Sequence, residues 1–225
     1  MEEFWNPLWL SARLAGYTTG ILLLISTPII YCLCMYHFAG KKVIKAMVAL
    51  PLILPPSVLG FYFLLAFSPA GKFGVFWQQI FDSRLAFSFH GILIASVVFS
   101  FPFMINPILS ALENLPISLT QASYSLGVTK WSTFTRVLIP NVKPSILSAI
   151  ILTFAHTIGE FGVILMIGGN IPKETRVASI AIFHELEMMN YQTANQYALI
   201  LLGFSFLVLL GLQLTQKNPT RPILC

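Results

Sequence analysis

Long apolar stretches separated by short polar segments run along the whole chain. A membrane-crossing helix needs roughly 20 mostly apolar residues, and five stretches have that length. They cover residues 17–38, 46–68, 86–111, 144–168 and 197–215. These stretches are too long and too uniformly apolar for the alternating strands of a membrane barrel, and backbone in lipid must satisfy its own hydrogen bonds. The pattern therefore predicts an all-α integral membrane protein with about five transmembrane helices.

Composition supports a membrane protein and excludes an ordinary soluble domain. Hydrophobic residues make up 56% of the 225 residues, and charged residues only 9%, against about 25% charged residues in soluble domains. Basic residues outnumber acidic ones by 13 to 8 but form no patch beside aromatic side chains, so no nucleic-acid partner is expected. We expect one transmembrane domain over residues 1–225, with the bilayer as its surroundings. Cys32 and Cys34 lie in an apolar run and Cys225 stands apart, so no disulfide framework is expected.

Both ends of the chain carry expectations of their own. Glu2 and Glu3 stand where a signal peptide would have basic residues, and no small-residue cleavage site follows. The first apolar run is therefore expected to be retained as a span. Few residues follow the fifth run, so no appended regulatory domain is expected.

Basic residues between the apolar runs predict the orientation in the membrane. With the N-terminus outside, the inner segments carry eight basic residues and the outer segments carry five. The inner set is Lys41, Lys42, Lys45, Lys130, Arg136, Lys143, Lys217 and Arg221, and the outer set is Arg13, Lys72, Arg84, Lys173 and Arg176. Loops rich in Lys and Arg stay in the cytoplasm. We therefore predict a multi-pass protein with its N-terminus outside and its C-terminus in the cytoplasm.

Several prolines fall within the apolar runs, where they kink or break a helix. They are Pro28, Pro51, Pro55, Pro56, Pro102 and Pro107. Such breaks persist in a membrane where neighbouring helices or an aqueous cavity satisfy the freed backbone groups. The run from Leu50 to Pro56 holds three of them. This pattern favours a protein that opens a path across the bilayer, although an isolated proline such as Pro28 could simply pack within a bundle.

The long polar loop 112–143 contains two helix signals. Ser118 followed three residues later by Gln121 is a capping-box pattern and predicts a helix starting near Leu119. Gly127 then stands where a left-handed cap would end that helix. The loop is therefore predicted to begin with a short helix and a glycine turn.

A second short helix is predicted after the glycine turn, with Thr129 at its start and Pro140 at its end. Ala122 and Ser123 keep one side of the first helix small, which suits close contact with another protein. The pair could instead lie in the headgroup layer, held by Trp131 and its basic neighbours. The residues alone leave both interpretations open.

Three short segments of this loop resemble a known signature. Gln121-Ala122-Ser123, Gly127 and Ile139-Pro140 are similar to the cytoplasmic EAA signature of bacterial ABC importer permeases. Gln121 replaces the acidic residue of that signature and lacks the charge for an ion pair with the ATPase, and Ser123 replaces its second alanine. The resemblance implies a type I ABC importer permease-like fold in the bacterial inner membrane, with coupling helices seated on a separate ATP-binding subunit.

The resemblance also implies partners and cofactors. ATP is expected on the ATP-binding subunit, no cofactor on this chain, and a substrate-binding protein outside. One chain has too few spans to enclose a path, so a homodimer with the path on its two-fold axis is expected.

Further segments narrow the resemblance to the molybdate permease branch. They are Leu50 to Pro56, Ser100-Phe101-Pro102, Gly159-Glu160-Phe161-Gly162 and Asn170 to Arg176. That branch commonly has Gly where Lys173 stands. The resemblance implies molybdate or tungstate as the transported ion, with sulfate or thiosulfate as the alternative.

Two groups of residues are candidates for the translocation path or its gate. They are Pro55, Pro56 and Ser57, and Gly159, Glu160, Phe161 and Gly162. Glu160 is the acidic residue in mid-span, where charges are costly and usually face protein or water. His156 lies four residues earlier and is predicted to hydrogen-bond Glu160. A buried structural carboxylate, a gate residue and half of a proton relay in a secondary transporter are the alternatives for Glu160.

The remaining candidates are hydroxyls, an outer loop and the histidines. Ser57, Ser100 and Asn106 lie beside prolines and could offer uncharged donors to an oxyanion. Lys173, Glu174, Thr175 and Arg176 could seat the outer binding protein or form an ordinary solvated loop. The four histidines have no metal spacing, and no nucleophile elbow or phosphate loop occurs. We therefore expect no metal and no enzyme activity on this chain, with ATP hydrolysed by the partner.

Overall fold

The computed structural model describes residues 2–215, and every regular element within them is helical. In chain order these are α1 (Glu2–Met35), α2 (Lys41–Ile53), α3 (Pro56–Phe67), α4 (Lys72–Phe81), α5 (Phe89–Glu113), α6 (Ile117–Ser125), α7 (Lys130–Thr133), the π-helix η1 (Phe134–Leu138), α8 (Ile139–Asn141), α9 (Lys143–Gly159), α10 (Gly162–Gly168), α11 (Ala178–Glu187) and α12 (Tyr191–Thr215). Lys217, Arg221, Cys225 and the C-terminus, about which the sequence made predictions, lie outside the described residues.

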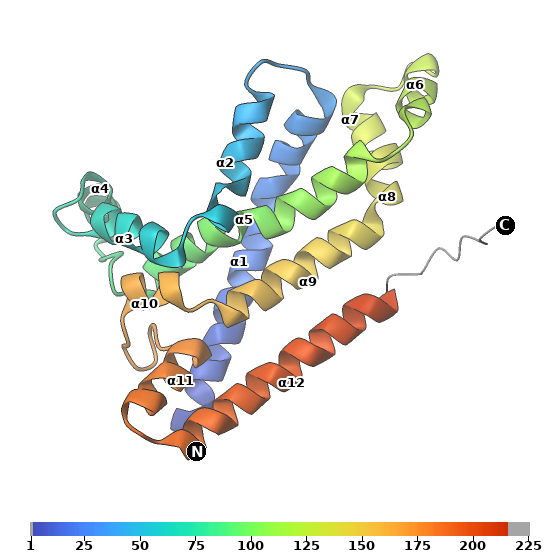
Figure 1. Cartoon of the computed structure of the whole chain (residues 1–225). Coiled ribbons are helices and arrows are strands. Elements are labelled where there is room, and N and C mark those ends of the chain that lie inside the picture. The colour runs from blue at the N-terminus through green and yellow to red at the C-terminus, as the bar shows by residue number, and fades with distance from the viewer. Residues whose placement is uncertain (1, 216–225) are drawn as a thin grey trace.

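The first helix is much longer than the predicted span 17–38. α1 has 34 residues, about 50 Å at 1.5 Å per residue, and it runs the height of the molecule (Figure 1). Polar residues such as Arg13 lower the local hydropathy, so the start of the helix does not stand out in the sequence. One face of this segment is nevertheless buried, through Leu10 and Leu14. A helix needs only one apolar face to be stabilised by packing.

The second apolar run is broken rather than continuous over 46–68. α2 and α3 meet at an angle of 107°. Leu54 is extended, with φ −71° and ψ 135°, because the proline that follows excludes the helical conformation. Pro56 is the first residue of α3. The backbone nitrogen at that position has no hydrogen-bond partner within any helix, so the missing N–H of proline costs nothing there.

The other prolines do not interrupt their helices. Pro28 lies inside α1, and both Pro102 and Pro107 lie inside α5. The neighbouring Thr27 hydroxyl donates to the Leu23 carbonyl at 2.8 Å, as hydroxyls often do near membrane prolines. Among these prolines, Pro55 and Pro56 stand at a break, whereas Pro28 lies within a continuous helix, which agrees with the alternative of packing within the bundle.

The predicted span 144–168 is also divided. α9 ends at Gly159, Glu160 is extended, and α10 begins at Gly162. The last helix, α12, starts six residues before the predicted 197. By length and apolar composition α1, α5 and α12 can each cross a membrane, and two bent helix pairs raise the number of candidate spans to five among the described residues.

The packing is organised around α1, α5 and α9, which contact one another pairwise. One apolar cluster includes Leu33, Ile105 and Phe134 and lies toward the end that holds the α1–α2 loop and α6 (Figure 1). A second cluster includes Leu14, Ile92 and Ile164 and joins α1 and α5 to α10. The N-terminus and α11 lie at the opposite end of the molecule from α6 (Figure 1).

Helix α3 packs closely on α10 through glycine. A Cβ atom added at Gly60 would lie 2.9 Å from the Met166 Cβ. We predict that Gly60→Ala lowers the free energy of unfolding by about 1–3 kcal/mol, because the two helices must separate. The measurement is the thermal unfolding midpoint in detergent. Gly203→Ala on α12 is the matched control, since its Cβ would meet nothing within 4 Å; equal midpoints for the two variants would contradict the close packing.

Candidate functional site

The two breaks in the apolar runs lie against each other. A Cβ atom at Gly162 would approach the Pro56 Cβ to 3.0 Å, and α3 and α10 are packed together (Figure 1). Pro55 and Ser57 are exposed. The structure thus brings together the two groups of residues that the sequence marked as candidates for the path.

Glu160 occupies the break between α9 and α10 and is only 4% exposed. Its Oε2 accepts a hydrogen bond from the Ser96 hydroxyl of α5 at 2.8 Å. Its backbone carbonyl accepts one from the Ser179 hydroxyl of α11 at 2.6 Å. Oε1 is buried without a hydrogen-bond partner among the described residues. Glu160 therefore joins the break to two other helices.

His156 does not bond Glu160, so that prediction is wrong. Its Nδ1 lies 3.0 Å from the Ser100 hydroxyl, and its ring stacks on Phe103 with centroids 3.9 Å apart. The reason is that α9 ends at Gly159, so residues 156 and 160 no longer share a helical face. The two groups bond different serines and form no direct relay.

A polar seam of Ser96, Ser100, Thr157 and Glu160 lies between α5 and α9. Ser100 bonds Thr157 at 3.1 Å as well as His156, and Ser96 and Ser100 are fully buried. Ser100 is therefore a tie between helices, contrary to its prediction as a hydroxyl that faces the path. Sequence reasoning missed Ser96 and Ser179. The spacing of Ser96 and Ser100, four residues apart on one face of an apolar helix, was the available signal.

The loop 112–143 follows its predicted plan with two differences. Gly127 has φ +72°, the left-handed conformation expected of it, and the Thr129 hydroxyl accepts from the Ser132 amide at 3.3 Å. The capping box is wrong, because Pro116 precedes the first residue of α6 and no side chain caps that helix. Proline at that position has no side-chain oxygen that could accept from the first helical amides.

Pro140 does not end the second helix. It lies in the first turn of α8, directly after the π-helix η1. A widened turn of this kind relieves the clash of a proline ring with the preceding turn. The helical path therefore continues from Lys130 to Asn141, then bends by 76° into α9.

The signature residues face different ways. Gln121 and Ala122 are exposed, whereas Ser123 is buried and its hydroxyl lies 2.8 Å from the Thr133 hydroxyl. Ser123 thus joins α6 to α7. The prediction that it forms part of a small exposed face is wrong. In the hairpin formed by residues 117–141, the most exposed large apolar residues are Ile117 and Leu126, at 74% and 82% exposure.

The predicted outer loop, residues 173–176, contains two different kinds of residue. Lys173 and Glu174 are exposed. Thr175 is fully buried, donating to the Gly168 carbonyl at 2.7 Å and accepting from the Ile171 amide at 3.1 Å, so its predicted contact with a binding protein is wrong. Arg176 donates to the Asn170 side chain. Lys173 has φ +66°, a conformation that favours glycine, the residue common at this position in the resembling branch.

Curated relatives cover nearly the whole chain. The chain is 42% identical over 208 residues to the molybdenum transport system permease protein ModB of Azotobacter vinelandii, covering 92% of both chains. It is 34% identical over 213 residues to the sulfate transport system permease protein CysT of Synechocystis sp., covering 95% of this chain and 73% of that protein. The corresponding protein of Escherichia coli is 31% identical over 214 residues, with coverage of 95% and 76%.

Solved structures share the fold at low sequence identity. A bacterial alginate ABC transporter in complex with its alginate-bound periplasmic protein matches with a TM-score of 0.78 at 16% identity, over 96% of this chain and 81% of that chain. The MetNI methionine ABC transporter in inward-facing conformations matches with a TM-score of 0.68 at 15% identity, over 96% and 95%.

The family model agrees with these relatives. Residues 18–217 match the binding-protein-dependent transport system inner membrane component. This chain belongs to that family and is the inner-membrane permease component of an ABC importer.

Proposed function

We propose that this chain is the permease subunit of a molybdate importer, with tungstate as a second substrate. The observation that carries the proposal is the 42% identity to a molybdenum permease over 92% of both chains. The sulfate permeases are the second candidate, at 34% identity over 73% of the Synechocystis protein. The segments from Leu50 to Pro56 and from Gly159 to Gly162 support the first candidate by their resemblance to the molybdate branch.

The proposed complex holds two copies of this chain, a cytoplasmic ATP-binding subunit that carries the ATP, and an outer binding protein. Transport proceeds by alternating access, with the N-terminus outside. The start of α2, with Lys41 and Lys42, lies at the same end as the α6–α7 region that carries Lys130 (Figure 1). Concentration of basic residues at one end supports placing that end in the cytoplasm.

The inner hairpin is proposed to receive the motion of the ATPase. Gln121 and Ala122 lie on the exposed side of α6, while Ser123 and Gly127 fix its shape, and Ile139 and Pro140 lie in the segment that enters α9. Because α9 ends at Gly159, next to Glu160, a tilt of this segment would reach the broken region directly. The exposed Ile117 and Leu126 suit burial in a groove of the partner.

The meeting of the two breaks is proposed to form the gate, with Pro55, Pro56 and Ser57 on one side and Gly159 to Gly162 on the other. Within this gate Glu160 acts as a lock, which means that it holds the break to α5, and it is not a ligand of the ion. A carboxylate would repel an oxyanion, and its Oε2 already accepts a hydrogen bond from Ser96. At the outer end, Lys173 and Glu174 are proposed to contact the binding protein. A proton-coupled mechanism through Glu160 and His156 lacks a direct bond between them.

The substrate is tested by transport. The chain is co-purified with its ATP-binding subunit and reconstituted into liposomes with the outer binding protein. We predict that molybdate uptake requires ATP, is reduced by excess tungstate and is little affected by equal excess sulfate. Omitting ATP, with a proton gradient imposed, is the control. Uptake that follows the gradient, or that prefers sulfate, would contradict the proposal.

The lock is tested at Glu160. We predict that Ser96→Ala and Glu160→Gln raise the ATPase activity measured without binding protein, because the hydrogen bond that joins the break to α5 is removed in the first variant and altered in the second. Ser148→Ala is the matched control, since that hydroxyl bonds only its own helix, at the Pro144 carbonyl. Unchanged coupling in both lock variants would assign Glu160 to packing alone.

Coupling is tested at Gly127. Its Cβ would meet nothing within 4 Å, so the effect of a substitution is conformational. We predict that Gly127→Val reduces stimulation of the partner's ATPase several-fold, whereas Gly127→Asn largely retains it, because Asn tolerates the left-handed region. Full stimulation by the Val variant, with normal membrane insertion, would refute the docking role.

A further inference from the structure

A groove opens on the surface between α1, α2 and α5. On α1 its wall includes Ile25, Ile29 and Leu33, which recur at the spacing of one helical face. Met47 and Val48 of α2 line the opposite side. The groove measures about 760 Å³, and its lining is almost wholly apolar. Its shape and chemistry suit a hydrocarbon chain.

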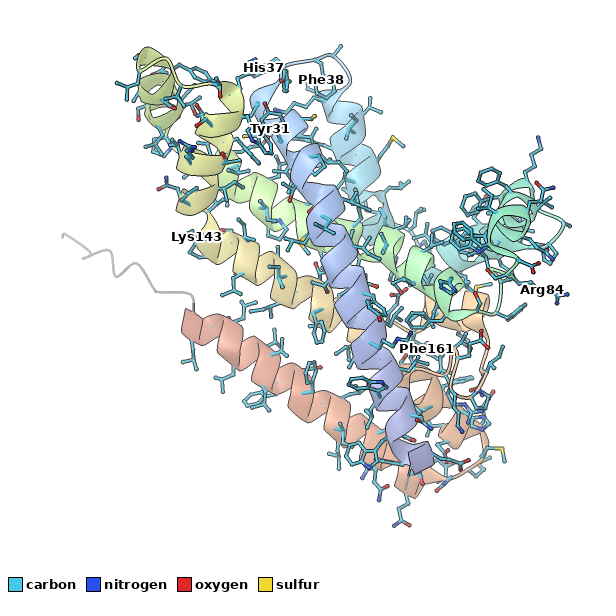
Figure 2. All side chains as sticks on the ribbon, turned by 180° about the vertical axis from the view of Figure 1, so that it is seen from behind. Tyr31, His37, Phe38, Arg84, Lys143 and Phe161 are labelled. Atoms are coloured by element: carbon cyan, nitrogen blue, oxygen red, sulfur yellow. The ribbon has the colours of Figure 1, made fainter. Side chains whose placement is uncertain are left out.

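A second hollow lies at the end of this groove. It is lined by His37, Lys41, Lys42 and Lys45, and it shares Phe38 with the apolar groove. Figure 2 shows His37 and Phe38 together at the end of α1 that leads into α2. The apolar groove and the basic hollow therefore adjoin at Phe38.

The geometry of α2 sets the order of the two parts. Lys41, Ile44 and Val48 follow at three- and four-residue intervals, so they lie along one face. At 1.5 Å per residue, Lys41 stands about 10 Å beyond Val48 along the helix. A molecule that enters the groove with an apolar chain thus meets cationic side chains at the α1–α2 loop.

Two of the cations are available to a ligand. Lys45 is paired with Glu113 at the end of α5. Within residues 2–215, Lys41 and Lys42 form no ion pair, and Lys42 and His37 are exposed. Glu113 is the acidic residue expected at this end, and it is already paired with Lys45. The same end of a second copy would therefore present basic side chains to Lys41 and Lys42, with no unpaired acidic group among the described residues of this end to neutralise them.

We propose that this surface binds one anionic phospholipid, with an acyl chain in the groove and its phosphate between His37, Lys41 and Lys42. The inference rests on the proposed function only in placing this end at the cytoplasmic leaflet, where anionic lipid and juxtamembrane basic residues attract each other. A bare oxyanion has no part that fills the apolar groove. The bound chain packs between α1 and α2, and so fixes the helix that leads to the break at Pro55.

The headgroup is tested by native mass spectrometry of the full chain in detergent. Dioleoyl phosphatidylglycerol and dioleoyl phosphatidylcholine, which share acyl chains, are titrated separately. We expect tighter binding of phosphatidylglycerol, and a loss of about 30-fold in that preference for Lys41→Gln/Lys42→Gln, the size typical of two basic side chains at an anionic surface. Lys72→Gln/Arg84→Gln is the charge-matched control away from the groove and keeps the preference. Equal binding of both lipids by the wild type would overturn the proposal.

The acyl chain is tested on the same helix. Met47→Trp fills the groove and is expected to weaken both lipids, whereas Val43→Trp, at an exposed position outside the lining, leaves binding unchanged. Inorganic phosphate that binds with the same lysine dependence, but is insensitive to Met47→Trp, would indicate a bare anion site instead. A Met47→Trp variant that changes the oligomeric state, with lipid retention intact, would assign the groove to a second copy. Because lipid retention is read without transport, its failure is distinguishable from failure of molybdate uptake.

Discussion

Where a helix breaks inside a membrane, the backbone groups that it frees must find partners within the protein. In this chain the break at Glu160 is held by side chains from two other helices. The Ser179 hydroxyl satisfies the freed carbonyl, and the Ser96 hydroxyl anchors the carboxylate. These two bonds let an extended residue exist between α9 and α10, and the packing of α10 against α3 depends on that break.

The broken region and the inner hairpin are linked by one continuous element. α9 connects the bend after Asn141 to Glu160. In its last turn, Thr157 and His156 both bond Ser100 of α5. These bonds fix the end of α9 beside α5, next to the break at Glu160. The Ser123–Thr133 bond does the same for α6 and α7.

Periodicity and composition predicted the helical class, the approximate spans and the glycine turn, because each depends on local chemistry. The turn at Gly127 depends on the left-handed conformation of that one residue. The cap at Thr129 depends only on the amide of Ser132, three residues later. The partners of His156, Ser123 and Thr175 could not be predicted, since each depends on which residues of other segments lie opposite. The start of α1 was missed because hydropathy averages over all faces of a helix, whereas a helix can pack against its neighbours through a single apolar face.

The same argument bears on the choice between molybdate and sulfate. The mid-span positions carry no Lys or Arg, and of the three polar residues considered as contacts, Ser100 is used within the seam while Ser57 is exposed. A path of uncharged donors binds a tetrahedral dianion weakly and discriminates little between ions of similar shape and charge, because discrimination needs polar groups that are left unpaired by the wrong ligand. Under the proposed function, selection would then fall to the outer binding protein. Permeases for molybdenum and for sulfate can therefore share this architecture at 42% and 34% identity to one chain.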